Sequence, residues 1–123
     1  VSIHFMNEKL DEGPIIARKE VEIRPDDTAY SLRQRLMEEQ FKLFKESWDE
    51  ILEGESTDQR PELGTTHHSS ELDELAKLDL NKELKLEEAI DLLRALTYDK
   101  GLATFQKNGD RYKISVDIEK RPD

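Results

Sequence analysis

The chain opens with Val1-Ser-Ile-His-Phe-Met-Asn-Glu-Lys-Leu-Asp-Glu-Gly-Pro-Ile-Ile16, and this stretch decides how its first part folds. The flanks, residues 1–6 and 14–17, are apolar enough to lie in a core as two strands. The polar segment between them ends in turn residues, since Gly13 permits an unusual φ and Pro14 fixes the exit of the chain. The stretch therefore predicts strand, loop and strand, with His4 and Asp11 placed around the loop.

Size and charge limit the classes of protein to which the chain can belong. Its 123 residues suit one small domain or a piece of a larger one. Hydrophobic residues make up 35% and charged residues 39%, so we expect a thin core or one completed by another segment. The net charge of −10, with Lys and Arg interleaved among Glu and Asp, argues against nucleic acid as a partner, because phosphate backbones need clustered cations.

The location of the protein in the cell is predicted from three features that the sequence lacks. There is no Cys, which is compatible with a reducing cytosol and excludes disulfides and thiolate chemistry. No apolar run approaches the roughly 20 residues of a membrane span, and the opening residues do not resemble a signal peptide. We expect a soluble, cytoplasmic protein that does not contact a membrane.

Hydrophobic spacing predicts a long helix after the opening loop. Residues 15–23 are expected to form a strand that ends at Pro25, after which Asp27 or Thr28 can cap a helix. The helix should continue to about Glu53 and stop at Gly54. Its apolar stripe is expected to face the core: Leu32, Leu36, Phe41, Phe44, Trp48, Ile51 and Leu52.

The rest of the chain predicts shorter elements. Residues 55–70 form a polar connector, and residues 72–80 a short helical turn followed by an extended piece. A second helix is expected over residues 86–96. Strands at 102–107 and 111–119 should form a hairpin around Asn108-Gly109, which is a strong turn signal. The predicted class is α/β.

Three side chains are candidates for chemistry. Asp11, in a tightened loop, could act as a general base or orient an imidazole, but an aspartate near a glycine also forms simple turns. His4 lies on a predicted buried strand, where a hydrogen-bonded core histidine is the plainer interpretation. His67 and His68 point to opposite faces of an extended chain and have no third ligand at a suitable spacing, so no metal is expected.

The residues just described carry a resemblance to a known family. The segment Ser2-Ile-His-Phe-Met-Asn-Glu-Lys-Leu-Asp-Glu-Gly-Pro-Ile-Ile-Ala17 closely resembles the signature of the folate-dependent formyltransferases. The likeness continues through 21–28 and 32–36. It then extends to Gln59, to 64–67, to 78–80 and to 89–96, as in the amino-sugar and methionyl-tRNA branches. It implies an α/β sheet of Rossmann type, of which this chain resembles the C-terminal part.

The resemblance also implies a site. Asp11 matches the family's catalytic Asp, which orients or ionises an imidazole and relays protons as the tetrahedral intermediate forms. Glu8, Lys9, Leu10, Asp11 and Gly13 match the segment that lines the folate pocket, with 10-formyltetrahydrofolate as the formyl donor. His4 matches a common histidine near the site, not the catalytic one. The family's Asn and His, which stabilise the oxyanion, are absent from this chain, so we expect no formyl transfer by the chain alone.

The acceptor is expected to be a small amine. The acidic balance disfavours tRNA, and the chain continues past the point where glycinamide ribonucleotide enzymes usually stop. A nucleotide-linked amino sugar is preferred, with His67 as its contact. The alternatives are a non-catalytic interaction module that keeps part of the fold, or a fragment of a glycinamide ribonucleotide or methionyl-tRNA formyltransferase.

The expected organisation has three parts. Residues 1–54 resemble the C-terminal part of a catalytic domain, residues 55–84 are a connector, and residues 85–123 are a helix plus hairpin extension. A missing N-terminal half of the domain is the expected partner segment. A homodimer is possible because an isolated half-sheet exposes an edge and an apolar face.

Overall fold

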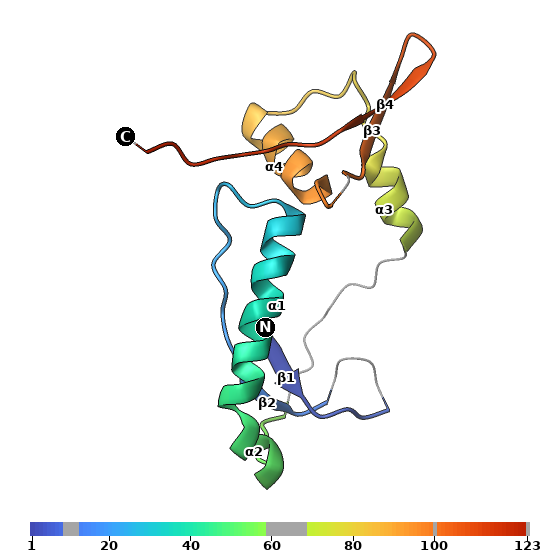
Figure 1. The fold of residues 1–123 in the computed structure, drawn as a ribbon. Coiled ribbons are helices and arrows are strands. Elements are labelled where there is room, and N and C mark those ends of the chain that lie inside the picture. Colours follow the sequence, from blue (N-terminus) through green and yellow to red (C-terminus); the bar gives the residue numbers. More distant parts are fainter. Residues whose placement is uncertain (9–12, 59–68, 100, 123) are drawn as a thin grey trace. The chain divides into compact units, whose positions relative to one another are not determined.

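The computed structural model describes residues 1–8, 13–58, 69–99 and 101–122 (Figure 1). The strands are β1 (Ser2–His4), β2 (Ile15–Arg18), β3 (Ala103–Lys107) and β4 (Asp110–Ile114). The helices are α1 (Ala29–Glu46), α2 (Trp48–Glu53), α3 (Ser69–Ala76) and α4 (Leu86–Leu96). This mixture confirms the predicted α/β class, including the long helix, the helix over 86–96 and the hairpin near the end.

The chain divides into two compact units. The first unit comprises residues 1–22 and 33–65, and the second comprises residues 23–32 and 66–123. Each unit therefore combines segments that are distant in the sequence. Within each unit, backbone hydrogen bonds join the two segments, between Ile15 and Thr57 in the first unit and between Tyr30 and Thr97 in the second.

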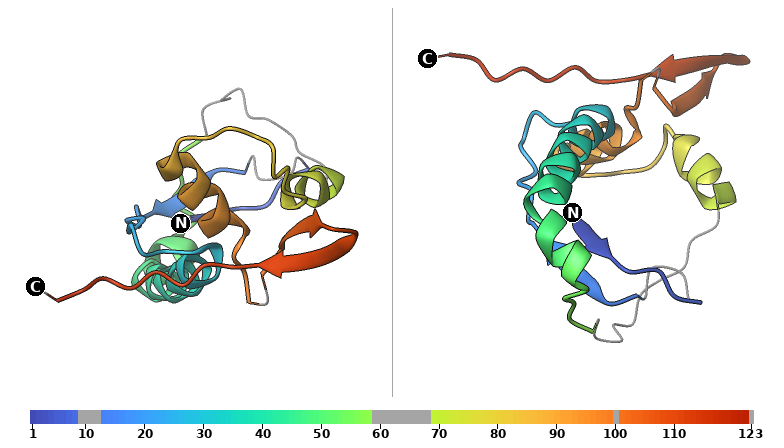
Figure 2. Two further views of the ribbon diagram at one scale, coloured as in Figure 1. Left: turned by 90° about the horizontal axis from the view of Figure 1, so that it is seen from above. Right: turned by 60° about the horizontal axis from the view of Figure 1, so that its bottom comes forward.

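In the first unit, β1 and β2 form an antiparallel pair that lies beside the later part of α1 (Figure 2). Ser2 pairs with Arg18 and His4 with Ile15, with an irregularity in register between Ile3 and His4. Ile15 also exchanges both backbone hydrogen bonds with Thr57 at 2.7 Å. The predicted strand over 15–23 is wrong in its length, because β2 ends at Arg18. Beyond it, Lys19 still exchanges both backbone hydrogen bonds with Val1 at 2.7 Å, and residues 20–23 are in no strand.

The predicted long helix is interrupted at Ser47. This residue has φ −100° and ψ 8°, outside the ordinary helical region. The backbone ladder still passes through it, since Ser47 N–H donates to Leu43 and Ile51 N–H donates to Ser47, both at 3.0 Å. The break is thus a local kink between α1 and α2. Gly54 ends α2 in the left-handed conformation at φ 72°, as the sequence predicted.

Part of the predicted apolar stripe of the long helix does not lie in a core. Leu43, which was not assigned to the stripe, is buried with 7% of its surface exposed, whereas Phe41 is 61% exposed. Phe44, Trp48 and Leu52 are exposed as well. The expectation of a core-facing stripe is therefore wrong for these residues. The aromatic rings among them have neighbours on the helix surface: the Phe44 and Trp48 rings meet edge to face at 5.4 Å, and the Lys45 ammonium lies 4.6 Å from the Phe41 ring centroid.

The second unit joins the start of α1 to the end of α4. Thr28 caps α1: its Oγ1 accepts from Ser31 N–H at 3.3 Å, and Ser31 Oγ accepts from Thr28 N–H at 2.9 Å. The buried Asp27 carboxylate accepts instead from Arg24 N–H at 2.8 Å and from the Ser31 hydroxyl at 2.9 Å. Of the two predicted caps, Thr28 therefore serves the helix and Asp27 serves the preceding turn.

The hairpin β3–β4 has the predicted turn. Asn108 and Gly109 have φ of 53° and 85°, and Lys107 pairs with Asp110 across this two-residue loop. Phe105 stacks on Tyr112 with ring centroids 5.4 Å apart. The predicted second strand to residue 119 is too long, since β4 ends at Ile114. Beyond it, Val116 N–H donates to the Thr97 hydroxyl at 3.0 Å.

Within the described residues, no helix is both long enough and apolar enough to cross a membrane.

Candidate functional site

The opening loop is closed at its base by the backbone. Phe5 N–H donates to the Pro14 carbonyl at 2.9 Å, so the segment between these residues begins and ends at one place. Gly13 is buried there, and a Cβ added to it would lie 1.5 Å from the Phe5 carbonyl oxygen. The sequence suggested Gly13 for an unusual φ, but its φ is not in the positive region. The glycine is needed because the Phe5 backbone comes too close for any side chain.

His4 lies against the same point. Its Nδ1 is 2.9 Å from the Phe5 carbonyl oxygen. A carbonyl can only accept, so Nδ1 carries a proton in this contact. The ring is partly buried and 3.2 Å from the position of a Cβ on Gly13. The predicted hydrogen-bonded histidine is therefore observed, and its orientation is fixed by the backbone of the loop base.

An apolar groove borders His4 on one side. Its volume is about 480 Å³, and it runs between β1 and one face of α1. The helix supplies residues at positions i, i+3, i+4 and i+7, so that they share one face: Met37, Gln40, Phe41 and Phe44. Sequence reasoning missed Met37 and Gln40, although this spacing was present in the chain.

The predicted site residues are only partly within the described part of the chain. Glu8 is exposed next to the loop, and Gly13 is buried at its base. Lys9, Leu10 and Asp11 lie outside the described residues, as does His67. The described ranges contain no cluster of three or more His, Cys, Asp or Glu side chains that could hold a metal ion.

One ion pair connects the strand side of the first unit to α1. Lys19 Nζ lies 2.5 Å from Glu39 Oε2, and the Glu39 side chain is 20% exposed. The hydrogen bond from Lys19 holds the pKa of the Glu39 carboxyl below its usual value, and the reciprocal bond raises the pKa of Lys19. Both groups are therefore charged over a wide pH range around neutrality, which keeps residue 19 beside the helix.

Comparison with protein families finds matches over most of the chain. Residues 1–47 match the formyl transferase family, and residues 71–120 match the N-formyltransferase dimerization C-terminal domain. The first match contains the β1–β2 pair, the loop base and α1. The second contains most of α3, α4 and the hairpin.

Curated relatives show the same likeness. Two proteins called dTDP-4-amino-4,6-dideoxyglucose formyltransferase, from Mycobacterium bovis and Mycobacterium tuberculosis, are each 36% identical over 100 residues. The match covers 80% of this chain and 43% of each relative. The chain thus spans less than half the length of these curated relatives.

Solved structures agree over almost the whole chain. A 4-N formyltransferase from Francisella tularensis superposes with a TM-score of 0.87 at 27% identity, over 98% of this chain and 51% of that one. A sugar N-formyltransferase from a Shewanella species gives 0.84 at 30% identity, over 98% and 50%. The chain is therefore similar to formyl transferases along most of its length, and among them to the sugar N-formyltransferases.

Proposed function

We propose that the chain is part of a larger enzyme that transfers a formyl group from 10-formyltetrahydrofolate to the amine of a nucleotide-linked amino sugar. The observation that carries this proposal is the order of the two family matches, at 1–47 and 71–120, in a chain similar to N-formyltransferases throughout. The curated relatives are named for an amino sugar linked to a nucleotide. Because the chain spans 43% of their length, the activity is assigned to the larger protein.

Asp11 is proposed as the catalytic residue of this chain. The acceptor amine attacks the formyl carbon, the bond from that carbon to the donor nitrogen breaks, and the proton lost by the amine passes to the leaving nitrogen. Asp11 would relay that proton and orient the imidazole supplied by the larger protein. Support comes from the loop base, where the Phe5–Pro14 bond and the close approach at Gly13 anchor the loop that carries Asp11.

Binding roles are proposed for the neighbouring residues. Glu8, Lys9, Leu10 and Gly13 would line the folate pocket together with Asp11, and His67 would contact the acceptor sugar. The division into residues 1–54, 55–84 and 85–123 stays a prediction, as does a cytoplasmic location. A homodimer is proposed because residues 71–120 match a domain described by its dimerization.

The experiment that tests this function uses the full-length protein. It is incubated with 10-formyltetrahydrofolate and either a thymidine-diphosphate-linked 4-amino sugar or glycinamide ribonucleotide, and release of tetrahydrofolate is measured. We expect turnover with the amino sugar and a loss of at least about 100-fold in kcat for Asp11→Asn, the range of one general acid–base contribution. Preference for the glycinamide would contradict the acceptor. Absence of any transfer would favour the non-catalytic interaction module.

A further inference from the structure

The first unit carries large apolar side chains on one face of its long helix. The helical backbone ladder continues through the kink at Ser47, so residues at positions i, i+4, i+7, i+11 and i+15 stay on one side of α1 and α2. This set, the exposed face, extends over about 22 Å at 1.5 Å per residue. Its five members are each between 43% and 67% exposed: Met37, Phe41, Phe44, Trp48 and Leu52.

The contacts within the exposed face leave it uncovered. The ring contact between Phe44 and Trp48, and the Lys45 ammonium at the Phe41 ring, both come from the helix itself. Leu43 is buried two positions from Phe41, about 200° around the helix, so the buried side of α1 is a different one. An extended apolar surface of this kind marks a contact surface in a soluble protein.

The groove beside His4 continues the exposed face toward β1. Met37, Phe41 and Phe44 belong to its helical wall, and residues 2–4 form the opposite wall. None of the described residues that line it is Asp, Glu, Lys or Arg, although 39% of the chain is charged. The buried centres of protein–protein contacts are likewise depleted of charged residues and enriched in aromatic residues and Met. The groove therefore suits an apolar protein surface and offers little to a ligand recognised by its charge.

The strand beside this groove has little support of its own. In the described part of the chain, β1 has β2 as its strand partner, in a two-stranded sheet. A pair of strands is marginally stable in water unless further strands or a packed apolar face complete it. The strand pair and the exposed face therefore both indicate a neighbour that would cover the groove between β1 and α1.

The lengths of the relatives show how much protein is available to cover it. The match covers 43% of each curated relative, and it covers 51% and 50% of the two solved N-formyltransferases. About half or more of each relative therefore lies outside the match. The exposed face falls in the first unit, the unit whose segments include most of the formyl transferase match at 1–47.

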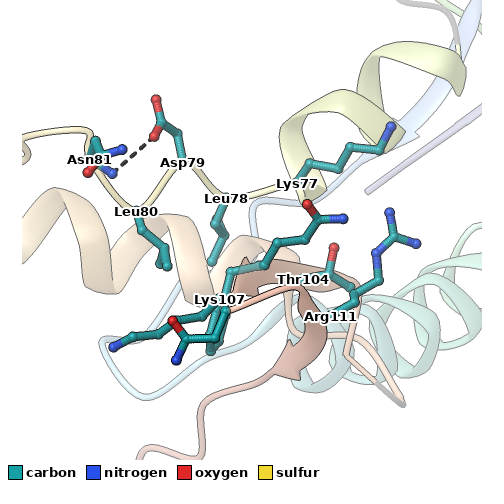
Figure 3. Close-up of a pocket in the computed structure, with 11 residues that line it drawn as sticks. Lys77, Leu78, Asp79, Leu80, Asn81, Thr104, Lys107 and Arg111 are labelled. Carbon is teal, nitrogen blue, oxygen red and sulfur yellow. Dashed lines mark hydrogen bonds between the residues drawn. The ribbon is translucent and has the colours of Figure 1, made fainter.

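The second unit has a groove of different chemistry. Its volume is about 620 Å³, and Lys77, Lys107 and Arg111 line it together with Asp79 (Figure 3). This groove lies within residues 71–120, which match the dimerization domain, so the homodimer proposed above accounts for its exposure. A contact between copies through that stretch gives no reason for the exposed face on α1, which needs an occupant of its own.

We infer that the exposed face and the groove beside β1 dock the part of the full-length protein that lies outside residues 1–123. The contact is made within one chain, between two apolar surfaces, and it supports the β1–β2 pair. His4 lines the groove and contacts the Phe5 carbonyl, so the docked part lies next to the base of the opening loop. The inference rests on the proposed function only in taking the chain as part of a larger enzyme.

The test measures oxidation of Met37 by hydrogen peroxide, followed by peptide mass spectrometry. The rate in the folded full-length protein is compared with the rates in the same protein unfolded in urea and in the folded 123-residue chain. Oxidation of methionine follows its exposure, so we expect protection of about tenfold or more in the full-length protein and little in the 123-residue chain. Equal protection in both would assign the face to a second copy and overturn the inference, as would no protection in the full-length protein.

Two serine variants of α1 test the same contact through stability. Phe41→Ser should lower the melting temperature of the full-length protein by about 5 °C or more, because a packed aromatic side chain is lost. Glu38→Ser, at an exposed charged position of the same helix, is the matched control and should change it by less than about 2 °C. Equal shifts in the two variants would contradict the docking.

Neither measurement depends on activity. The oxidation of Met37 needs no variant, so it decides the inference even where Phe41→Ser does not fold. Protection of Met37 in a full-length protein that transfers no formyl group supports the docking and removes the proposed function alone. Formyl transfer by a protein in which Met37 is oxidised as fast as in urea removes this inference alone.

Discussion

Arg94 of α4 donates through Nε to the backbone carbonyl of Asp27 at 2.7 Å, although the two residues are 67 positions apart in the sequence. The same guanidinium donates through Nη2 to the Arg24 carbonyl at 2.7 Å and through Nη1 to Asp91 Oδ1 at 2.7 Å. One side chain thus closes the turn before α1 onto the last turns of α4. The planar fork of arginine is what allows three acceptors to be reached together.

Replacing Arg94 should therefore destabilise the second unit. Arg94→Met keeps much of the side-chain volume but leaves the Asp27 and Arg24 carbonyls without their charged donor. We expect a loss of about 1–3 kcal/mol in the free energy of unfolding, measured by urea denaturation followed by circular dichroism. Arg111→Met, an arginine without a described partner, is the control and should cost less than about 0.5 kcal/mol. Equal losses in the two variants would contradict the role given to Arg94.

Gly13 should tolerate no side chain. In Gly13→Ala the new Cβ would fall 1.5 Å from the Phe5 carbonyl oxygen, so the Phe5–Pro14 closure must open. The comparison is Gly54→Ala, where the Cβ meets nothing within 4 Å and only the positive φ is unfavourable, at about 1 kcal/mol. We expect Gly13→Ala to exceed that cost clearly and to speed exchange of the Phe5 amide hydrogen. A smaller loss of stability at Gly13 than at Gly54 would contradict the close approach.

The exposed helix aromatics should contribute little to the stability of this chain. Phe41→Ser should change the free energy of unfolding by less than about 0.5–1 kcal/mol, while Leu43→Ala, two positions away and buried, should cost about 2–5 kcal/mol. Binding of a hydrophobic dye should fall in Phe41→Ser, because the apolar groove beside His4 loses one wall. A large loss of stability from Phe41→Ser would show that this side chain is packed after all.

Stability should depend on pH through the Lys19–Glu39 pair. The pKa of Glu39 is lowered in the folded chain, so its contribution is present above its usual value of 4.5 and is lost as pH falls through the folded value. The pKa of Lys19 is raised, so its contribution is lost only as pH rises above 10.5. The destabilisation caused by Glu39→Gln, measured by urea titration, should therefore be greatest near neutral pH and shrink in acid.

The control for this prediction is Glu38→Gln. Glu38 is adjacent on α1, and no ion pair is found for it among the described residues. Its replacement should leave the pH dependence of unfolding unchanged. A Glu39→Gln effect that stays constant down to pH 3 would contradict the lowered pKa.

Local signals in the sequence predicted local structure. The Asn108-Gly109 turn, the Gly54 stop, the Thr28 cap and the helix over 86–96 each depend on residues close together in the chain, and each is observed. The predicted lengths of the strands were wrong because a strand lasts only as long as its partner. That partner is set by the fold and not by the alternation of residues.

Contacts between residues that are far apart in the sequence could not be predicted from local signals. Nothing in the spacing of Arg94 indicates that it reaches Asp27, and the apolar spacing of α1 does not show that Leu43 is buried while Phe41 is exposed. Gly13 was recognised as special for the wrong reason, since a close approach to Phe5 cannot be read from local turn statistics. The proposed roles of Asp11 and His67 came from resemblance, and both residues lie outside the described part of the chain.

The second unit is built from two separate stretches of the sequence, and this affects its folding during translation. Residues 23–32 belong to a unit whose remainder begins at residue 66, and the Tyr30 N–H bonds to the Thr97 carbonyl. During synthesis at about 5–20 residues per second, this segment leaves the ribosome several seconds before α4 exists. Over that interval the Arg24 and Asp27 carbonyls are hydrated and the capped start of α1 has no docking surface. Completion of the second unit is thus timed by translation of residues 66–123, and a pause there would prolong exposure of the segment to proteases and chaperones.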